Sequence, residues 1–250
     1  IVVMSEKDKM LAGELYDANY DEELIKDRYK AKDICFEYNN LKPSDFEGKD
    51  RIIKKLFAKT GKQIIVEQNF WCDYGYNIFV GENFYMNHNC TILDGAKVEF
   101  GDNVFIAPNC GFYTAGHPLD YETRNKGLEY AKTIKVGSNV WIGGNVCVMP
   151  GVTIGDNVVI GAGSVVTKDI PSNVVAVGNP CRVLKEIWKL IILGKIEKIN
   201  ERRKRYKSDY LYRGTDRNKN ELIDVDSIIK YTKIWRWKLW LNQNRILVNW

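Results

Sequence analysis

The stretch from residue 136 to residue 170 is VGSNVW-IGGNVC-VMPGVT-IGDNVV-IGAGSV-VTKDI when it is divided into groups of six. Each group begins with an aliphatic residue and has a small or β-branched residue at its fifth position. The two files are Val136, Ile142, Val148, Ile154, Ile160 and Val166, and Val140, Val146, Val152, Val158, Ser164 and Ile170. A period of six fits neither a helix nor the plain alternation of a strand. Hexapeptide repeats of this kind are typical of a parallel β-helix.

The same register extends toward the N-terminus. Apolar residues recur every six positions from Val80 to Ile92 and, after a shift of two residues, from Phe100 to Phe112. Phe112 and Val136 are separated by a multiple of six residues, so the same register continues in the stretch that begins at Val136. Residues 113–133 are therefore predicted to leave the solenoid as a loop. This segment has no repeat of its own and is rich in Gly, Pro and polar residues. Loops of this length are uncommon and are often functional.

Charge is unevenly distributed along the 250 residues, which carry a formal net charge of +5. Residues 1–194 contain 22 Lys and Arg against 25 Asp and Glu, whereas residues 195–250 contain 15 against 7. The body is nearly neutral, which gives no indication of a nucleic-acid partner. The C-terminal excess includes a basic run at 202–205. A contact with a membrane surface or a polyanion is one interpretation of it. We favour the alternative interpretation, that this C-terminal part of the chain is a solvated extension. Four tryptophans also lie there, Trp235, Trp237, Trp240 and Trp250.

Six cysteines are scattered along the chain without any Cys-x-x-Cys pair. Their neighbours are mostly apolar, so we expect buried hydrophobic residues rather than a disulfide framework or a metal site. No N-terminal stretch has the character of a signal peptide, and no apolar run approaches the length of a membrane span. We therefore expect a reduced, cytoplasmic protein. Residues 1–3, which precede Met4, look like residues upstream of the natural start and are assigned no role.

The sequence predicts three regions: an N-terminal helical cap at 1–62, the β-helix at 63–183, and a basic, Trp-containing extension of uncertain structure at 184–250. In the first region, Ser44 and Glu47 have the spacing of a capping box and predict a helix start. The helix that follows places four apolar residues on one face, Ile52, Ile53, Leu56 and Phe57. A helical cap covers coil surface that would otherwise be exposed at the end of a solenoid.

Several blocks outside the bare repeat are distinctive. They are KMLAGELY at 9–16, CDYGYNI at 72–78, FYMN at 84–87, TAGHP at 114–118, NVWIGG at 139–144, VVTKDIP at 165–171 and GNPCR at 178–182. These blocks resemble the maltose and galactoside O-acetyltransferases of the hexapeptide acyltransferase superfamily, and the first two are the most specific. The resemblance implies a left-handed parallel β-helix, a homotrimer, and active sites between neighbouring subunits.

Acetyl transfer from a thioester to a hydroxyl group requires a base for the hydroxyl proton and donors for the oxyanion. Histidine is the side chain best matched to the first task, and the chain has two, His88 and His117. His117 lies in the protruding loop and in the TAGHP block, so we expect it to be the general base, with His88 on the coil surface. The resemblance places Asn87 opposite His117. Glu129 is predicted to orient His117 through its other ring nitrogen.

The resemblance also assigns two substrate sites. The acceptor positions are Asp17, Arg28, Asp73, Tyr85 and Asp94. Carboxylates suit sugar hydroxyls, and an aromatic ring suits the apolar face of a sugar. Asp73 and Asp94 have an alternative role as turn residues that close β-helix corners. The coenzyme A positions are Trp141, Gly144, Ala162, Thr167, Lys168 and Arg182. The Gly144 main-chain N–H is the expected oxyanion donor. Lys168 and Arg182 are expected to pair with the phosphates of coenzyme A.

The predicted function is therefore transfer of an acetyl group from acetyl-coenzyme A directly to a hydroxyl of maltose, glucose or a galactoside, without a metal. One alternative is an acetyltransferase for a hydroxyl acceptor that is not a sugar. Another is a non-catalytic trimeric scaffold whose basic extension binds a partner. A zinc carbonic anhydrase on the same solenoid is excluded, because it requires three His ligands and the chain has two.

Overall fold

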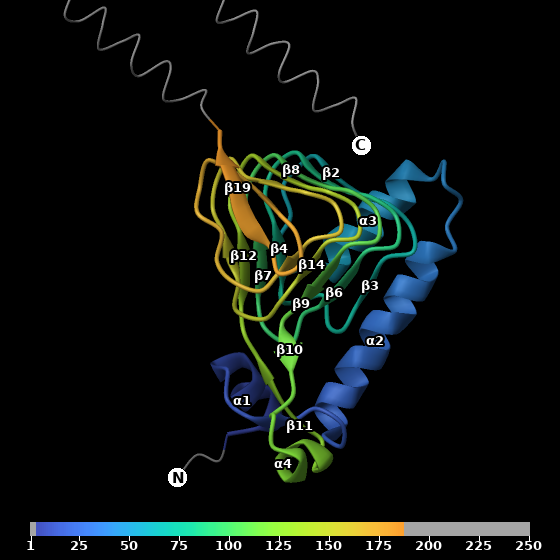
Figure 1. Ribbon diagram of the computed structural model, residues 1–250. Coiled ribbons are helices and arrows are strands. Elements are labelled where there is room, and N and C mark those ends of the chain that lie inside the picture. Colours follow the sequence, from blue (N-terminus) through green and yellow to red (C-terminus); the bar gives the residue numbers. More distant parts are fainter. Residues whose placement is uncertain (1–3, 188–250) are drawn as a thin grey trace, which may run out of the picture. The chain divides into compact units, whose positions relative to one another are not determined.

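Stacked parallel strands form a three-sided β-helix in the computed structural model, which describes residues 4–187 (Figure 1). Face 1 contains β4 (Ile78–Val80), β7 (Val98–Phe100), β12 (Ile134–Val136) and β15 (Thr153–Ile154). Face 2 contains β2 (Ile64–Val66), β5 (Phe84–Met86), β8 (Val104–Ile106), β13 (Val140–Ile142), β16 (Val159–Ile160), β18 (Val174–Val177) and β19 (Arg182–Glu186). Face 3 contains β3 (Trp71–Cys72), β6 (Thr91–Leu93), β9 (Gly111–Tyr113), β14 (Cys147–Val148) and β17 (Val165–Val166). The predicted mainly β fold is confirmed.

The two files of the hexapeptide repeat lie inside the solenoid. The first file, from Val136 to Val166, is at most 3% exposed, and the second file is at most 5% exposed. Burial of these aliphatic side chains is the main favourable contribution to the stability of the coils. The predicted shift of two residues is also present. Val80 pairs with Phe100, whereas Val136 pairs with Ile154, so the earlier coil is two residues longer.

Asparagines turn the chain between face 1 and face 2. They adopt positive φ, between 53° and 64°, a region that Asn tolerates better than most side chains, at Asn83, Asn103, Asn139, Asn157 and Asn173. Their side-chain amides also bond along the stack, with 2.9 Å from Asn83 Nδ2 to Asn103 Oδ1 and 2.9 Å from Asn157 Nδ2 to Asn173 Oδ1. The repeat therefore stabilises this corner as well as the core.

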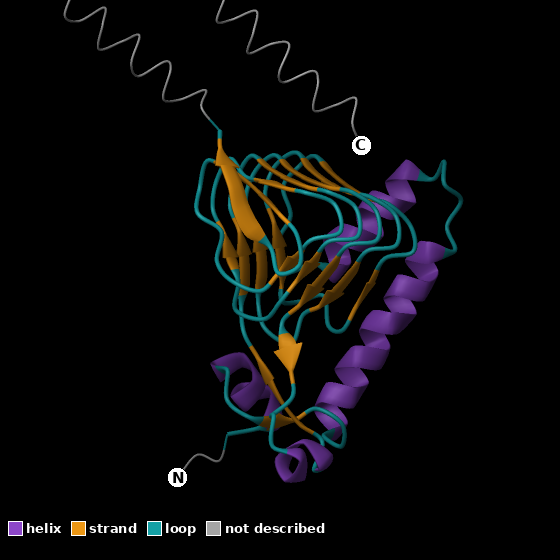
Figure 2. Cartoon of the chain, viewed as in Figure 1, coloured by secondary structure: helices purple, strands orange, loops and turns teal. Residues whose placement is uncertain are grey.

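Helices cover the N-terminal end of the β-helix (Figure 2). They are α2 (Glu22–Asn39) and α3 (Phe46–Leu56), whereas α1 (Glu6–Ala12) packs against the short strand β1 (Tyr16–Asp17) and belongs to a separate hydrophobic cluster. Side chains from α2 and α3, such as Cys35 and Ile53, belong to the same hydrophobic cluster as the coils. The predicted cap at Ser44 is wrong by one residue. Asp45 is the N-cap, and its carboxylate accepts the Gly48 N–H at 2.9 Å, a placement that the helix dipole favours.

The segment predicted as a loop has structure of its own. It contains β10 (Ala115–Gly116), α4 (Tyr121–Asn125) and β11 (Leu128–Ala131). Strand β11 pairs antiparallel with β10 on one side and with β1 on the other. The excursion at 113–133 is thus confirmed, and its order comes from a strand near the N-terminus that the repeat pattern does not reveal.

At the C-terminal end, β18 and β19 form an antiparallel pair on face 2, and β19 runs through the predicted boundary at residue 183. The basic run at 202–205 and the four tryptophans lie outside the described residues. All six cysteines are free thiols, five of them buried, as predicted. None of the helices within 4–187 has the length and apolar character needed to cross a membrane.

Candidate functional site

Most of the predicted site residues lie at two corners of the β-helix. The first, which we call the Asn87 corner, contains the turns from face 2 to face 3, at 87–90, 107–110, 143–146 and 161–164. The second, the His117 corner, contains the turns from face 3 to face 1, at 73–77, 94–97, 114–133, 149–152 and 167–169. Face 3 separates the two corners. Within one chain, Asn87 and His117 therefore lie on different edges of the solenoid.

His117 follows β10 and has a half-exposed side chain. Its Nδ1 lies 3.3 Å from the Leu128 carbonyl oxygen, on the antiparallel strand β11. A carbonyl only accepts, so we assign the ring proton to Nδ1, which leaves Nε2 of the neutral imidazole with a free lone pair. The orienting group on Nδ1 is thus the Leu128 carbonyl and not Glu129, because strand pairing brings the backbone of β11 alongside the ring.

Glu129 lies on the other side of the imidazole. Its Oε1 is 3.8 Å from His117 Nε2, and its Oε2 accepts a hydrogen bond from the Tyr16 hydroxyl at 3.2 Å. Tyr16 is 2% exposed, and burial together with the Glu129 charge raises its pKa well above the usual range. The hydroxyl therefore stays protonated as a donor. Sequence reasoning missed Tyr16, although it ends the distinctive KMLAGELY block.

Arg28 and Asp73 lie close to this group. Arg28 Nη1 donates to the Tyr74 hydroxyl at 2.9 Å, and its Nη2 donates to the Ala18 carbonyl. Burial raises the pKa of Asp73, and the positive charge of Arg28 opposes that shift. The guanidinium of Arg28 and the half-buried carboxylate of Asp73 thus lie near the His117 corner. Both are polar groups that can form hydrogen bonds with a hydroxylated ligand.

Asp17 and Asp94 have structural partners. Asp17 Oδ1 accepts the N–H groups of Asn19 and Tyr20 at 3.1 and 3.0 Å and closes a turn after β1. Asp94 is 0% exposed, and its carboxylate accepts backbone N–H groups from three residues of the preceding coil, Asp73, Tyr74 and Asn77. With no exposed surface, Asp94 has the alternative role foreseen for it: it holds the extended turn of the longer coils.

Tyr85 and Asn87 are remote from His117 in the chain. Asn87 Oδ1 accepts the His88 N–H at 2.8 Å, and His88 is exposed, as predicted. Tyr85 points outward from face 2, paired across the sheet with Ile65 on one side and Phe105 on the other. These two acceptor-site candidates therefore require a second surface to meet the His117 corner.

The candidate coenzyme residues also divide between the corners. Gly144 and Ala162 lie at the Asn87 corner, and within residues 4–187 neither backbone N–H makes a hydrogen bond. Free N–H groups in a column fit a pantetheine arm and an oxyanion. Trp141 is 52% exposed on face 2 beside them. Thr167 and Lys168 are exposed at the His117 corner, and Arg182 is exposed on β19.

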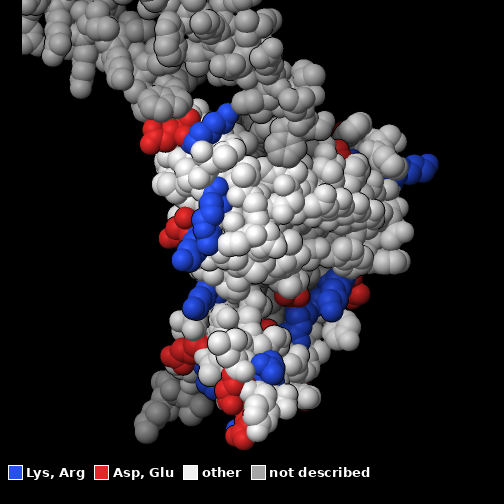
Figure 3. Space-filling model, in the orientation of Figure 1, with Lys and Arg blue, Asp and Glu red and all other residues white. Residues whose placement is uncertain are grey.

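The outer surfaces of face 1 and face 2 differ in charge. Glu99 and Lys135 project from face 1 and pair at 3.9 Å. The central outward positions of face 2 are apolar or aromatic from Ile65 to Val175, at Ile65, Tyr85, Phe105, Trp141, Val159 and Val175. Figure 3 shows a broad area of the coils without charged side chains, with charges gathered below it and along one edge. In the described part of the chain, His, Cys, Asp and Glu form no group suited to a metal.

Comparisons with known proteins agree with the observed fold. Residues 9–61 match the maltose acetyltransferase hexapeptide capping motif, and residues 133–168 match the bacterial transferase hexapeptide in six repeats. The crystal structure of a maltose O-acetyltransferase from Clostridium difficile 630 is 59% identical, with a TM-score of 0.73, over 74% of this chain and 98% of that chain. A galactoside acetyltransferase solved with coenzyme A is 48% identical, with a TM-score of 0.71, over 74% of this chain and 92% of that chain. The galactoside O-acetyltransferase of Escherichia coli (strain K12) is 48% identical over 180 residues, which are 72% of this chain and 88% of that protein.

Proposed function

Because the chain belongs to the maltose and galactoside O-acetyltransferase family of hexapeptide-repeat enzymes, we propose that it acetylates a hydroxyl group of a sugar by direct transfer. As a member of this family, the protein is an acetyltransferase. Acetyl-coenzyme A is the co-substrate and supplies the acetyl group as a thioester. The observation that carries the proposal is the contact between His117 Nδ1 and the Leu128 carbonyl, at 3.3 Å. It supports a proton on Nδ1, which leaves Nε2 as the nitrogen that exchanges a proton with the acceptor hydroxyl.

His117 Nε2 removes the proton from the acceptor hydroxyl while the hydroxyl oxygen attacks the thioester carbonyl. The free N–H of Gly144 stabilises the negative charge that develops on the carbonyl oxygen. His117 then returns the proton to the leaving thiolate. Glu129, 3.8 Å from Nε2 and held by Tyr16, stabilises the imidazolium that exists between these two proton transfers.

We place this site between two chains of a homotrimer. The His117 corner of one chain would supply the base, Arg28, Asp73 and Lys168, and the Asn87 corner of the next would supply Asn87 and the free N–H groups. The separation of these corners by face 3 supports a shared site. The uncharged outer file of face 2 supports association, because exposed apolar surface of this extent commonly marks an interface.

The acceptor is a hexose derivative in this proposal, of the maltose, glucose or galactoside type. Arg28, Asp73 and Tyr85 supply the donors, acceptors and flat aromatic surface that pyranose recognition uses. An acceptor hydroxyl outside a sugar remains the alternative, and a non-catalytic scaffold is disfavoured by the family. The free thiols suit a reducing compartment, and we keep the cytoplasm as the site of action.

Thiol release from acetyl-coenzyme A tests the proposal. The protein is incubated with glucose, maltose, methyl β-galactoside or, as the matched non-sugar polyol, glycerol. We expect release that depends on a sugar and an acetylated sugar in the products. Release with glycerol alone would favour the alternative, and no release with any acceptor from a folded trimer would overturn the sugar proposal. Light scattering during gel filtration reports the trimer in the same samples.

A further inference from the structure

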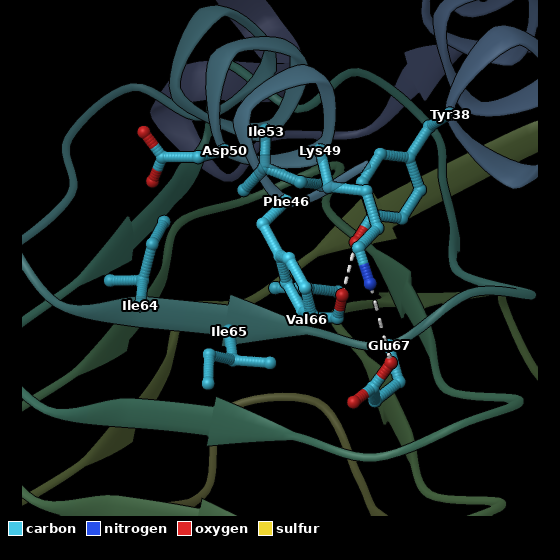
Figure 4. Close-up of a pocket in the computed structure, with 9 residues that line it drawn as sticks. All are labelled: Tyr38, Phe46, Lys49, Asp50, Ile53, Ile64, Ile65, Val66 and Glu67. Atoms are coloured by element: carbon cyan, nitrogen blue, oxygen red, sulfur yellow. Dashed lines mark hydrogen bonds and ion pairs between the residues drawn. The ribbon is translucent and has the colours of Figure 1, made fainter. Parts of the chain in front are cut away.

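A cavity of about 260 Å³ lies between helix α3 and strand β2, at the first coil of the β-helix (Figure 4). Most of its wall is apolar, with contributions from Phe46, Ile53, Ile64, Ile65 and Val66. The hydroxyl of Tyr38 fixes one side by donating to the Val66 carbonyl. Pockets for drug-sized ligands begin near ~300 Å³, so this cavity suits a single ring.

Three charged residues line the cavity, Lys49, Asp50 and Glu67, and Asp50 is paired with Lys54 Nζ at 2.9 Å. Lys49 is only 9% exposed, yet its ammonium makes no hydrogen bond to any residue within 4–187. Its nearest opposite charge is Glu67 Oε2 at 3.8 Å, longer than the ~3.2 Å limit of a direct N–H···O bond. Figure 4 shows the ammonium directed toward this carboxylate beside the apolar wall.

Partial burial of an ammonium that makes no hydrogen bond within the protein is unfavourable, and its place in the first turn of α3 adds the repulsion of the helix dipole. The Glu67 carboxylate offsets part of this cost. The three N–H donors of Lys49 and the acceptor oxygens of Glu67 nevertheless remain available to a third group. A cavity whose donor, Lys49 Nζ, lies 3.8 Å from its acceptor, Glu67 Oε2, is therefore suited to bind a neutral polar ligand.

Strand pairing places the cavity beside the acceptor-site candidates on face 2. In the parallel pairing of β2 with β5, Ile65 lies opposite Tyr85, and the Glu67 N–H bonds to the Met86 carbonyl at 2.8 Å. The next position in that register puts Glu67 beside Asn87, one strand spacing of about 4.8 Å away. The charge of Glu67 also contributes, after burial, to raising the pKa of Tyr85, which agrees with their closeness.

We propose that this cavity is a second carbohydrate subsite, which holds the sugar ring next to the one that is acetylated. Lys49 donates to one hydroxyl of that ring and Glu67 accepts from its neighbour, while Phe46 and Ile65 cover the apolar face of the ring. A carboxylate ligand fits less well, because Glu67 repels it. The substrate class is then a disaccharide rather than a free hexose. This inference rests on the proposed function, since Tyr85 and Asn87 hold the first ring only if sugars are the acceptors.

The test compares kcat/KM for maltose with kcat/KM for glucose, and for lactose with galactose. The variants are Lys49→Met, which keeps the apolar stem, and Glu67→Gln, which keeps the shape; Lys55→Met, exposed on the same helix, is the matched control. We expect the disaccharide preference to fall about tenfold in the first two, the scale of one lost hydrogen bond to a charged group, and to stay at the wild-type value in the control. An unchanged preference in both Lys49→Met and Glu67→Gln, with their melting curves intact, would overturn the subsite.

Binding separates failure of the subsite from failure of the proposed function. Isothermal titration with maltose, in the presence of coenzyme A, needs no turnover. If no sugar is acetylated but maltose binds to the wild type and about tenfold more weakly to Lys49→Met, the subsite survives and the acetylation proposal fails. If maltose binds equally to both proteins, or to neither, the subsite is overturned whatever the activity.

Discussion

The Asn87 corner and the His117 corner are built from the same coils, yet they differ in regularity. At the Asn87 corner the turns repeat closely, with Asn89, Asn109 and Asn145 all near φ 60°. At the His117 corner the chain inserts a hairpin with a helix, buries Asp94 and recruits β1 from the N-terminus. The comparison teaches that the regular corner offers a column of backbone groups, whereas side-chain chemistry is concentrated where the repeat is interrupted.

Replacing His117 by Ala should produce the largest effect. Loss of the general base lowers kcat by a factor of about 10² to 10⁴, the usual range for such a group. Steady-state thiol release measures it, and circular dichroism checks that the fold is kept. His88→Ala is the matched control, because His88 is exposed at the regular corner and should leave kcat unchanged. Equal losses in the two variants would contradict the assignment of the base to the His117 corner.

Mixed assemblies should show whether the corners of two chains meet. His117→Ala and Asn87→Ala chains, each expected to have strongly reduced activity alone, are produced together with different affinity tags. In a cyclic trimer with random assortment, about one interface in four combines the intact Asn87 of one chain with the intact His117 of its neighbour. Activity should therefore recover to about a quarter of the wild-type value. Mixed trimers no more active than the parent variants would mean that the two residues do not share a site.

Asp94 should give the interrupted corner a distinctive dependence on pH. Burial is the main cause that raises the pKa of Asp94 to about 7, well above the ordinary value of an aspartate. Between about pH 4 and pH 7 the native state then holds this proton more tightly than the unfolded state does, so its contribution to stability falls as pH rises. The slope for one group is at most about 1.4 kcal/mol per pH unit.

Thermal unfolding of the wild type and of Asp94→Asn measures this contribution. The stability of the wild type relative to the variant should be greater at pH 5 than at pH 7.5. A difference between the two proteins that is constant with pH would show that Asp94 titrates as an ordinary carboxylate. Asp156→Asn, at an exposed turn of a regular coil, is the control for the loss of a surface carboxylate.

Substitutions at two adjacent glycines should separate effects on packing from effects on catalysis at the Asn87 corner. A Cβ at Gly143 would lie 2.6 Å from the Ala162 backbone nitrogen, whereas a Cβ at Gly144 would lie 3.4 Å from the Pro108 carbonyl oxygen. Gly143→Ala should therefore cost about 1–3 kcal/mol in the free energy of unfolding. Gly144→Ala should be nearly neutral and keep its activity, because the N–H donor remains. Denaturant titration and thiol release measure both, and a large loss of activity in folded Gly144→Ala would contradict the main-chain donor.

The hexapeptide period was sufficient to predict the β-helix, because only a three-sided coil buries an aliphatic residue at every sixth position. The excursion at 113–133 was visible as the place where the period fails. The order within that excursion was not visible, because β11 is held by Tyr16–Asp17, more than a hundred residues away. Likewise, the carbonyl that orients His117 belongs to a backbone position, and a backbone group leaves no signature in residue types.

The sequence by itself determined the architecture, since a repeat encodes both the inward aliphatic files and the corner asparagines locally, residue by residue. It also determined the candidate general base, because the chain has only two histidines and one of them, His117, lies in the segment where the repeat is interrupted. Only the tertiary structure decided how those groups are used: that Leu128, not Glu129, contacts Nδ1, that Asp94 is enclosed, and that Lys49 and Glu67 face one cavity. These facts depend on distances between segments remote in the chain, which are set by how the helices and the excursion pack against the coils.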